Sequence, residues 1–194
     1  MSGRYDLVVL GGGTGGLVSA MIAAGLGARV ALVERERTGG DCLWTGCVPS
    51  KSLIAAANLA HRMRHASAPG LAPVEPQIDL ARVMNHVQDA IRTIEPESSP
   101  ERLRAAGVEL IEAEGRFVGP RKIDVGGREL AYLAAIIATG SEPVVPPIAG
   151  LVNAQPLTTD TVWQPRRQLA QLPDGLGRQR LGVWEAGDRG DHRL

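Results

Sequence analysis

Residues 5–34 read YDLVVLGGGTGGLVSAMIAAGLGARVALVE, and this stretch decides the fold. Tyr5–Leu10 is a short apolar run typical of a buried strand, and Arg29–Glu34 is a second one. Between them, apolar residues from Leu17 to Ala24 recur at helical spacing. Two strands separated by one helix predict a parallel pair with a right-handed crossover, which is a βαβ unit.

The turn after the first predicted strand carries three glycines in the pattern G-x-G-x-x-G: Gly11, Gly13 and Gly16. In this position the first glycine permits the tight turn, the second lets a pyrophosphate approach the backbone, and the third lets helix and strand pack closely. Glu34 ends the second strand, where a carboxylate can accept hydrogen bonds from ribose hydroxyls. The series predicts dinucleotide binding, and the alternative is a tight glycine-rich turn without a ligand.

The rest of the chain predicts an α/β fold with a small antiparallel meander. We expect a loop over residues 35–48 and then helices from Pro49 to about His65, from Asp79 to Ile94, and from Ser99 or Pro100 to Gly107. Leu53, Ala56, Ala57, Ala60 and Met63 form the expected buried face of the first of these helices. Strand patterns follow over residues 108–119, 121–125 and 128–140, with Gly126 and Gly127 as a hairpin turn and 134–138 as a buried strand.

The composition is that of an ordinary globular protein: 194 residues, 44% hydrophobic, with 21 basic residues against 21 acidic ones. A zero balance argues against nucleic acid or an anionic membrane as a partner. The uncharged stretch 7–28 is interrupted by glycines and is neither a spanning helix nor a signal peptide, so we expect a cytoplasmic protein. After Trp163 the apolar periodicity is lost, and residues 164–194 are expected to form an irregular or aberrant tail beyond a domain of residues 1–163.

The second motif is GGDCLWTGCVPSK, from Gly39 to Lys51. Cys42 and Cys47 can close a small disulfide ring if the chain begins to coil there, which favours redox chemistry in a cytosolic protein. Half of a metal site and two inert packed cysteines remain as alternatives, although zinc needs further nearby ligands. Because Cys47 precedes the expected helix start at Pro49, we expect the helix dipole to lower the pKa of its thiol.

Together the two motifs resemble those of the flavin-dependent pyridine nucleotide-disulfide oxidoreductases, a family that includes dihydrolipoamide dehydrogenase, glutathione reductase and mercuric reductase. The resemblance covers residues 1 to about 163 and implies a Rossmann-like FAD-binding domain that is incomplete relative to the family. It implies that NAD(P)H reduces FAD, that FAD reduces the Cys42–Cys47 disulfide, and that the dithiol reduces a small disulfide or a metal ion. No resident metal is implied.

The resemblance also assigns roles to single residues. Cys47 would face the flavin, Cys42 would exchange with substrate, and Lys51 would lie beside the flavin ring. The cofactor-binding set it implies is Gly11, Gly13, Thr14, Gly15, Gly16, Glu34, Arg35, Gly40, Asp41, Lys51, Gly115, Ala138, Thr139 and Gly140. Within it, Glu34 would bind the adenosine ribose and the backbone of Gly115 the adenine.

The sequence departs from the commoner family pattern at Asp41 and at Leu43-Trp44-Thr45, which is closer to the mercuric-reductase-like branch. We expect this sequence to lack the family's NAD(P)H domain, the dimerisation domain that makes the family homodimeric, and the catalytic His–Glu pair. A truncated or frameshifted nucleotide-binding fragment without catalysis is therefore the alternative prediction. His61, His65 and His86 are expected to be surface or packing residues, and the Arg-rich tail is expected to be solvated.

Overall fold

The computed structural model of the chain describes residues 4–67 and 69–163. Its first elements are β1 (Tyr5–Leu10), α1 (Thr14–Gly25) and β2 (Val30–Glu34). β1 and β2 pair in parallel, with Leu7 opposite Val30 and Leu10 opposite Val33. The predicted βαβ unit is confirmed. The prediction for residues 164–194 lies outside the described residues.

All six described strands form one sheet in the order β3-β2-β1-β6-β5-β4. β3 (Val108–Glu112), β2, β1 and the second half of β6 (Arg128–Ile137) are parallel. β4 (Gly115–Gly119), β5 (Lys122–Val125) and the first half of β6 form the antiparallel meander. β6 therefore belongs to both parts and joins them into the predicted α/β architecture.

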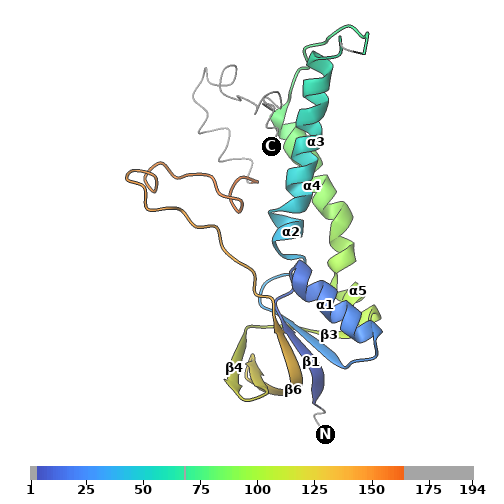
Figure 1. Ribbon diagram of the computed structural model, residues 1–194, viewed down its shortest axis with the longest axis vertical. Helices are drawn as coiled ribbons and strands as arrows, with labels where there is room; N and C mark the ends of the chain where they lie inside the picture. Colours follow the sequence, from blue (N-terminus) through green and yellow to red (C-terminus); the bar gives the residue numbers. More distant parts are fainter. Residues whose placement is uncertain (1–3, 68, 164–194) are drawn as a thin grey trace, which may run out of the picture.

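Each face of the sheet has its own hydrophobic core. On one face α1 and α5 (Pro100–Ala105) cover the strands, and Ala20 and Leu103 pack against Val9 and Leu32. On the other face side chains of the meander, including Ile123 and Leu130, close over Tyr5, Val8 and Val33. The carboxyl ends of β1, β2 and β6 meet at one edge, below the remaining helices (Figure 1).

The remaining helices are α2 (Gly40–Trp44), α3 (Cys47–Arg64), α4 (Leu80–Ile94) and the short 3-10 helix η1 (Glu95–Ser98). α3 and α4 form a long antiparallel pair that rises from the sheet (Figure 1), with Met84, Val87 and Ile91 of α4 buried. Two helices have side-chain N-caps where the sequence predicts their starts: Asp79 accepts the Arg82 N–H, and Ser99 accepts the Arg102 N–H. None of the helices in this part of the chain has the length and apolar character that crossing a bilayer requires.

The loop prediction for residues 35–48 was wrong. α2 lies within it, and α3 begins at Cys47, so Pro49 occupies the third helical position rather than the first. Pro is tolerated there because the first four N–H groups of a helix have no intrahelical partner. The expected buried face of α3 is not buried: Leu53, Ala56, Ala60 and Met63 are half-buried, and Ala57 is exposed.

Two strand predictions also needed correction. The run 108–119 is two strands that part at Ala113 and Glu114, one entering the parallel sheet and the other the meander. The run 134–138 is a strand up to Ile137, but it is not buried, since the side chain of Ile137 is 66% exposed. The meander covers only the beginning of β6, where Leu130 and Tyr132 are buried. The hairpin at Gly126 and Gly127 is confirmed, and both have positive φ.

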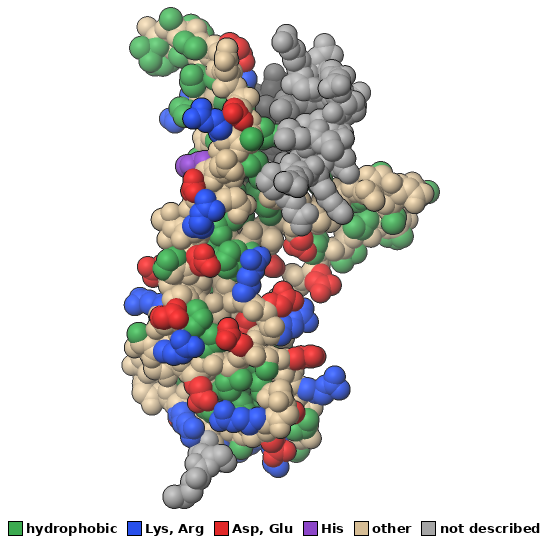
Figure 2. Space-filling model, turned by 180° about the vertical axis from the view of Figure 1, so that it is seen from behind, with side chains coloured by type: hydrophobic (Ala, Val, Ile, Leu, Met, Phe, Trp, Pro, Cys, Tyr) green, Lys and Arg blue, Asp and Glu red, His purple; other side chains and the backbone are tan. Residues whose placement is uncertain are grey.

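Charges of both signs are intermixed on the face of the molecule in Figure 2, where no large single-sign area is seen over the described residues.

Candidate functional site at the carboxyl edge of the sheet

The glycine turn between β1 and α1 is packed so closely that two of its residues have no room for a side chain. Gly11 has φ of 104°, and a Cβ there would overlap the carbonyl oxygen of Ala138 at the end of β6. A Cβ on Gly16 would overlap the carbonyl oxygen of Gly11. Because these glycines have no side chains, the start of α1 packs closely against the sheet edge. Gly16 is buried in this packing.

The N-terminus of α1 lies in this turn, and its first N–H groups have no partner within the helix. The N-cap residue Gly13 provides no side-chain cap, and the first turn of the helix carries no acidic residue. Such a helix end is suited to bind phosphate, because its N–H groups lack partners and its dipole is positive.

Glu34 stands beside this turn at the end of β2. Its Oε2 accepts the Gly12 N–H at 2.6 Å, and its Oε1 accepts the Glu36 N–H at 2.8 Å. The carboxylate is half-buried and held in one orientation. Its oxygens have further lone pairs that can accept hydroxyl donors.

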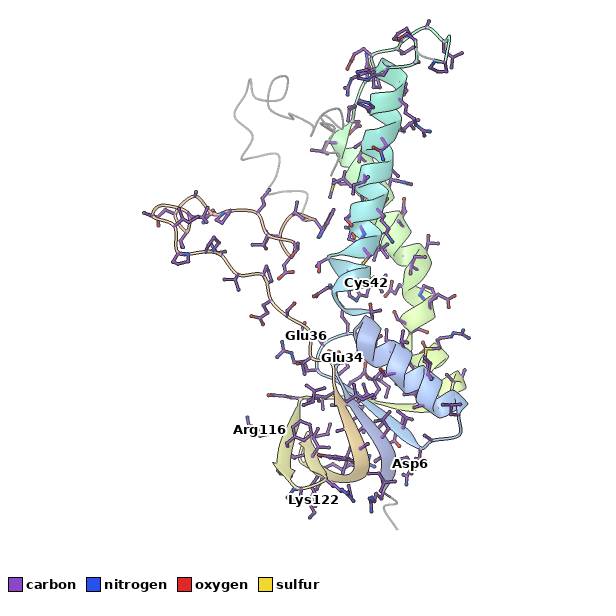
Figure 3. All side chains as sticks on the ribbon, viewed as in Figure 1. Asp6, Glu34, Glu36, Cys42, Arg116 and Lys122 are labelled. Atoms are coloured by element: carbon purple, nitrogen blue, oxygen red, sulfur yellow. The ribbon has the colours of Figure 1, made fainter. Side chains whose placement is uncertain are left out.

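A cavity of about 1220 Å³ lies over this edge. This exceeds the ~300–1,000 Å³ usual for small-molecule sites, which suits an elongated ligand of dinucleotide size. Figure 3 places Glu34 at the sheet edge and Cys42 on α2 above it. The predicted residues that line the cavity are Gly11, Gly13, Thr14, Gly15, Glu34, Arg35, Gly40, Asp41, Cys42, Ala138, Thr139 and Gly140.

A second cavity of about 150 Å³ lies next to the first and shares Gly11, Glu34, Arg35 and Thr139 with it. Gly115, the first residue of β4, lines this smaller cavity. The structure therefore brings Gly115 beside Glu34, although 80 residues separate them in the sequence.

The two cysteines lie on consecutive helices that only Thr45 and Gly46 connect. A Cβ on Gly46 would lie 2.8 Å from the carbonyl oxygen of Asp41, so the chain turns tightly between α2 and α3. Both cysteines are free thiols; Cys42 is half-buried and Cys47 is exposed. No group of three or more potential metal ligands gathers within residues 4–67 and 69–163.

The expectation of a lowered pKa at Cys47 was wrong. A hydrogen bond with Cys42 raises the pKa of the Cys47 thiol, and the charge of Cys42 acts in the same direction. The positive charge of Lys51, one helical turn further along α3, lowers this pKa but does not outweigh Cys42. A hydrogen bond to the neutral thiol disfavours ionisation.

The structure does not bring every predicted residue to the cavity wall. Cys47 and Lys51 lie outside the set that lines it, whereas Cys42 belongs to it. The resemblance gave the flavin-facing role to Cys47, whereas the thiol that lines this cavity is that of Cys42.

Sequence reasoning missed several lining residues. Arg37 lies over the ring of Trp44 at 3.8 Å from its centroid, and both line the cavity. Thr158, Asp160 and Thr161 form another part of the wall. The alternating charges of Glu34-Arg35-Glu36-Arg37 were a local signal for Arg37. No local signal connects residues 158–161 with the glycine turn, which lies more than a hundred residues away.

The comparisons with known proteins agree with the geometry. The family model described as pyridine nucleotide-disulphide oxidoreductase matches residues 5–179. A mercuric reductase of Bacillus cereus is 31% identical over 172 residues, which is 89% of this chain and 27% of the relative. A dihydrolipoyl dehydrogenase of Thermus scotoductus is 36% identical over 179 residues, which is 92% of this chain and 37% of the relative.

A dihydrolipoyl dehydrogenase of Zymomonas mobilis is 39% identical over 146 residues, or 73% of this chain and 31% of the relative. The chain thus spans well under half the length of these curated relatives. Proteins of this family use FAD and NAD(P)H. The matched family model covers nearly all of the described residues, and this chain belongs to the pyridine nucleotide-disulphide oxidoreductase family.

Proposed function

We propose that this chain binds FAD at the carboxyl edge of its sheet and that Cys42 and Cys47 are its redox-active pair. The observation that carries the proposal is a single cavity lined by the glycine turn, by Glu34 and by Cys42. A phosphate-binding helix end, a ribose-binding carboxylate and a thiol at one cavity suit a dinucleotide cofactor that exchanges electrons with sulfur.

The binding residues divide by the part of the cofactor they suit. The free N–H groups of α1 suit the pyrophosphate, with Thr14, Gly40 and Asp41 close by, and Glu34 suits the adenosine ribose. The smaller cavity beside Gly115 is an apt place for the adenine ring. Arg35, Ala138, Thr139 and Gly140 line the space between these groups.

FAD, when bound, supplies the capacity to take a hydride equivalent from NAD(P)H and to pass on an electron pair. The chain contributes the two sulfurs: a disulfide between Cys42 and Cys47 would break on taking up two electrons, one sulfur keeping the bonding pair and the other receiving the new pair, and each sulfur would bind a proton to become a thiol. Lys51 places a positive charge near Cys47 that favours its thiolate. Of the two thiols, one would exchange with substrate and the other would face the cofactor.

The substrate of this chemistry would be a small disulfide or a thiol-binding metal ion. Mercuric reductase is named for a metal ion, and dihydrolipoyl dehydrogenase for a dithiol whose oxidised form is a small disulfide. A pair of cysteines can ligate such a metal ion and can exchange with such a disulfide.

The test is an absorbance spectrum of the purified chain after addition of FAD and desalting, before and after NADH, NADPH or dithionite. Retained flavin absorbance supports the proposal, and a colourless protein would refute cofactor binding. Cys42→Ser and Cys47→Ser variants then separate the two roles, because only loss of the thiol that faces the flavin abolishes long-wavelength absorbance of the reduced protein. If neither substitution changes the reduced spectrum, the redox role of the cysteines is wrong.

A further inference from the structure

The peptide between the two cysteines has a carbonyl group that its own helix leaves without a donor. In α3 the Gly46 carbonyl oxygen accepts the Ser50 N–H at 3.0 Å, four residues along. Thr45 precedes Gly46, the N-cap of α3, and is itself the C-cap of α2, so neither helix gives its carbonyl oxygen a backbone donor.

A distant side chain supplies the missing donor. The indole N–H of Trp163 donates to the Thr45 carbonyl oxygen at 2.7 Å, across 118 residues of sequence. Trp163 and Thr45 are both half-buried. Their bond is therefore partly shielded from water. A carbonyl group that is shielded from water and has no hydrogen-bond donor costs free energy.

The segment that carries Trp163 is itself held in a turn. The Thr158 N–H donates to Thr161 Oγ1 at 2.9 Å, and the Val162 N–H donates to the Thr158 carbonyl oxygen at 2.9 Å. Thr158 and Thr161 also line the large cavity. The turn thus connects the cavity wall to the loop between the thiols.

We infer that Trp163 is a positioning residue for the Cys42–Cys47 pair. This inference rests on the redox role proposed above. The turn between the cysteines contains only Leu43, Trp44, Thr45 and Gly46, so the orientation of the Thr45 peptide sets the separation of the two sulfurs. By fixing that peptide, the indole N–H keeps the thiols close enough to form a disulfide.

The test is the equilibrium of the full 194-residue chain with a reduced and oxidised glutathione pair, followed by acid quenching and mass spectrometry. A bond between Cys42 and Cys47 forms as the disulfide bond of oxidised glutathione breaks, and two molecules of glutathione leave with the protons of the two thiols. Trp163→Phe keeps the aromatic ring and removes the N–H. We expect the equilibrium constant for disulfide formation to fall about three- to tenfold, the effect of one hydrogen bond.

A second substitution tests whether the effect belongs to the indole N–H. Val162→Ala is the matched control in the same segment and should leave the equilibrium constant unchanged. Circular dichroism of each variant shows that the fold is kept.

The outcomes separate the two proposals. If the wild-type chain forms no disulfide at any glutathione ratio, the redox role of Cys42 and Cys47 is wrong. If wild type forms it and Trp163→Phe changes its equilibrium by less than twofold, or Val162→Ala changes it as much as Trp163→Phe does, the positioning role of Trp163 is wrong.

Discussion

The Oε2 atom of Glu34 accepts the backbone N–H of Gly12 at 2.6 Å, which ties the end of β2 to the glycine turn after β1. The bond is made within the chain itself, so the acid is already oriented at the cavity. Preorganisation of this kind increases affinity because less freedom is lost when the ligand binds.

Glu34→Gln should therefore weaken FAD binding about 10- to 100-fold, since a hydrogen bond to a charged group contributes ~1.5–3 kcal/mol. The measurement is a titration of flavin fluorescence against protein concentration. Glu112→Gln is the control, because Glu112 ends the neighbouring strand β3, pairs in register with Glu34 and is exposed outside both cavities. Equal losses in the two variants would contradict a ribose-binding role.

Gly16→Ala should destabilise the fold by about 3 kcal/mol, because the added methyl group overlaps the Gly11 carbonyl oxygen in a tightly packed turn. The measurement is the free energy of unfolding from urea titration. Gly25→Ala, at the end of the same helix, is the control: a methyl group there meets nothing within 4 Å, so stability should stay the same or rise by a few tenths of a kcal/mol. A Gly16→Ala variant as stable as wild type would mean that the turn relaxes freely.

The raised pKa of Cys47 predicts its reactivity. Because Cys42 raises this pKa through a hydrogen bond, Cys47 is a thiol at neutral pH and becomes a thiolate only at more alkaline pH. Cys42→Ala removes the cause, so the midpoint for alkylation of Cys47 by iodoacetamide should move to lower pH.

Lys51→Met should have the opposite effect, because the positive charge of Lys51 lowers the pKa of Cys47. Both effects can be measured as the pH dependence of the alkylation rate, with mass spectrometry assigning the modified cysteine. The interpretation fails if Cys42→Ala moves the midpoint to higher pH.

Tyr5 links three strands at the other end of the sheet. Its hydroxyl group donates to Glu109 Oε2 at 2.7 Å, and Arg128 Nη2 donates to the same hydroxyl at 3.3 Å. Tyr5→Phe should lower the free energy of unfolding by about 1 kcal/mol at pH 7, the usual value of one such hydrogen bond.

This contribution should depend on pH. Burial raises the pKa of Tyr5 above 10, with the hydrogen bond to Glu109 acting in the same direction. The folded state therefore resists ionisation, so the stability that Tyr5 adds is full below pH 10 and is lost as the pH rises through the pKa of the folded protein. Urea titrations of wild type and Tyr5→Phe between pH 7 and 11 should converge, and a constant difference would contradict this.

Much of the fold could be predicted because its signals are local. The βαβ unit follows from apolar periodicity and from glycines at fixed offsets, and the N-caps at Asp79 and Ser99 follow from side-chain chemistry within three residues. The helix α2 escaped prediction because its five residues begin with Gly40, directly after Gly39, and contain no repeat long enough to show a period.

The amino-acid sequence by itself determined the nucleotide-binding turn, the acid at the end of β2 and the spacing of the two cysteines, because each depends on residues close together along the chain. Only the tertiary structure decided which thiol lines the cavity, in which direction the pKa of Cys47 moves, and that Trp163 completes the hydrogen bonding of Thr45. These features depend on distances between atoms on different elements, and such distances arise only when the sheet and the helices have packed.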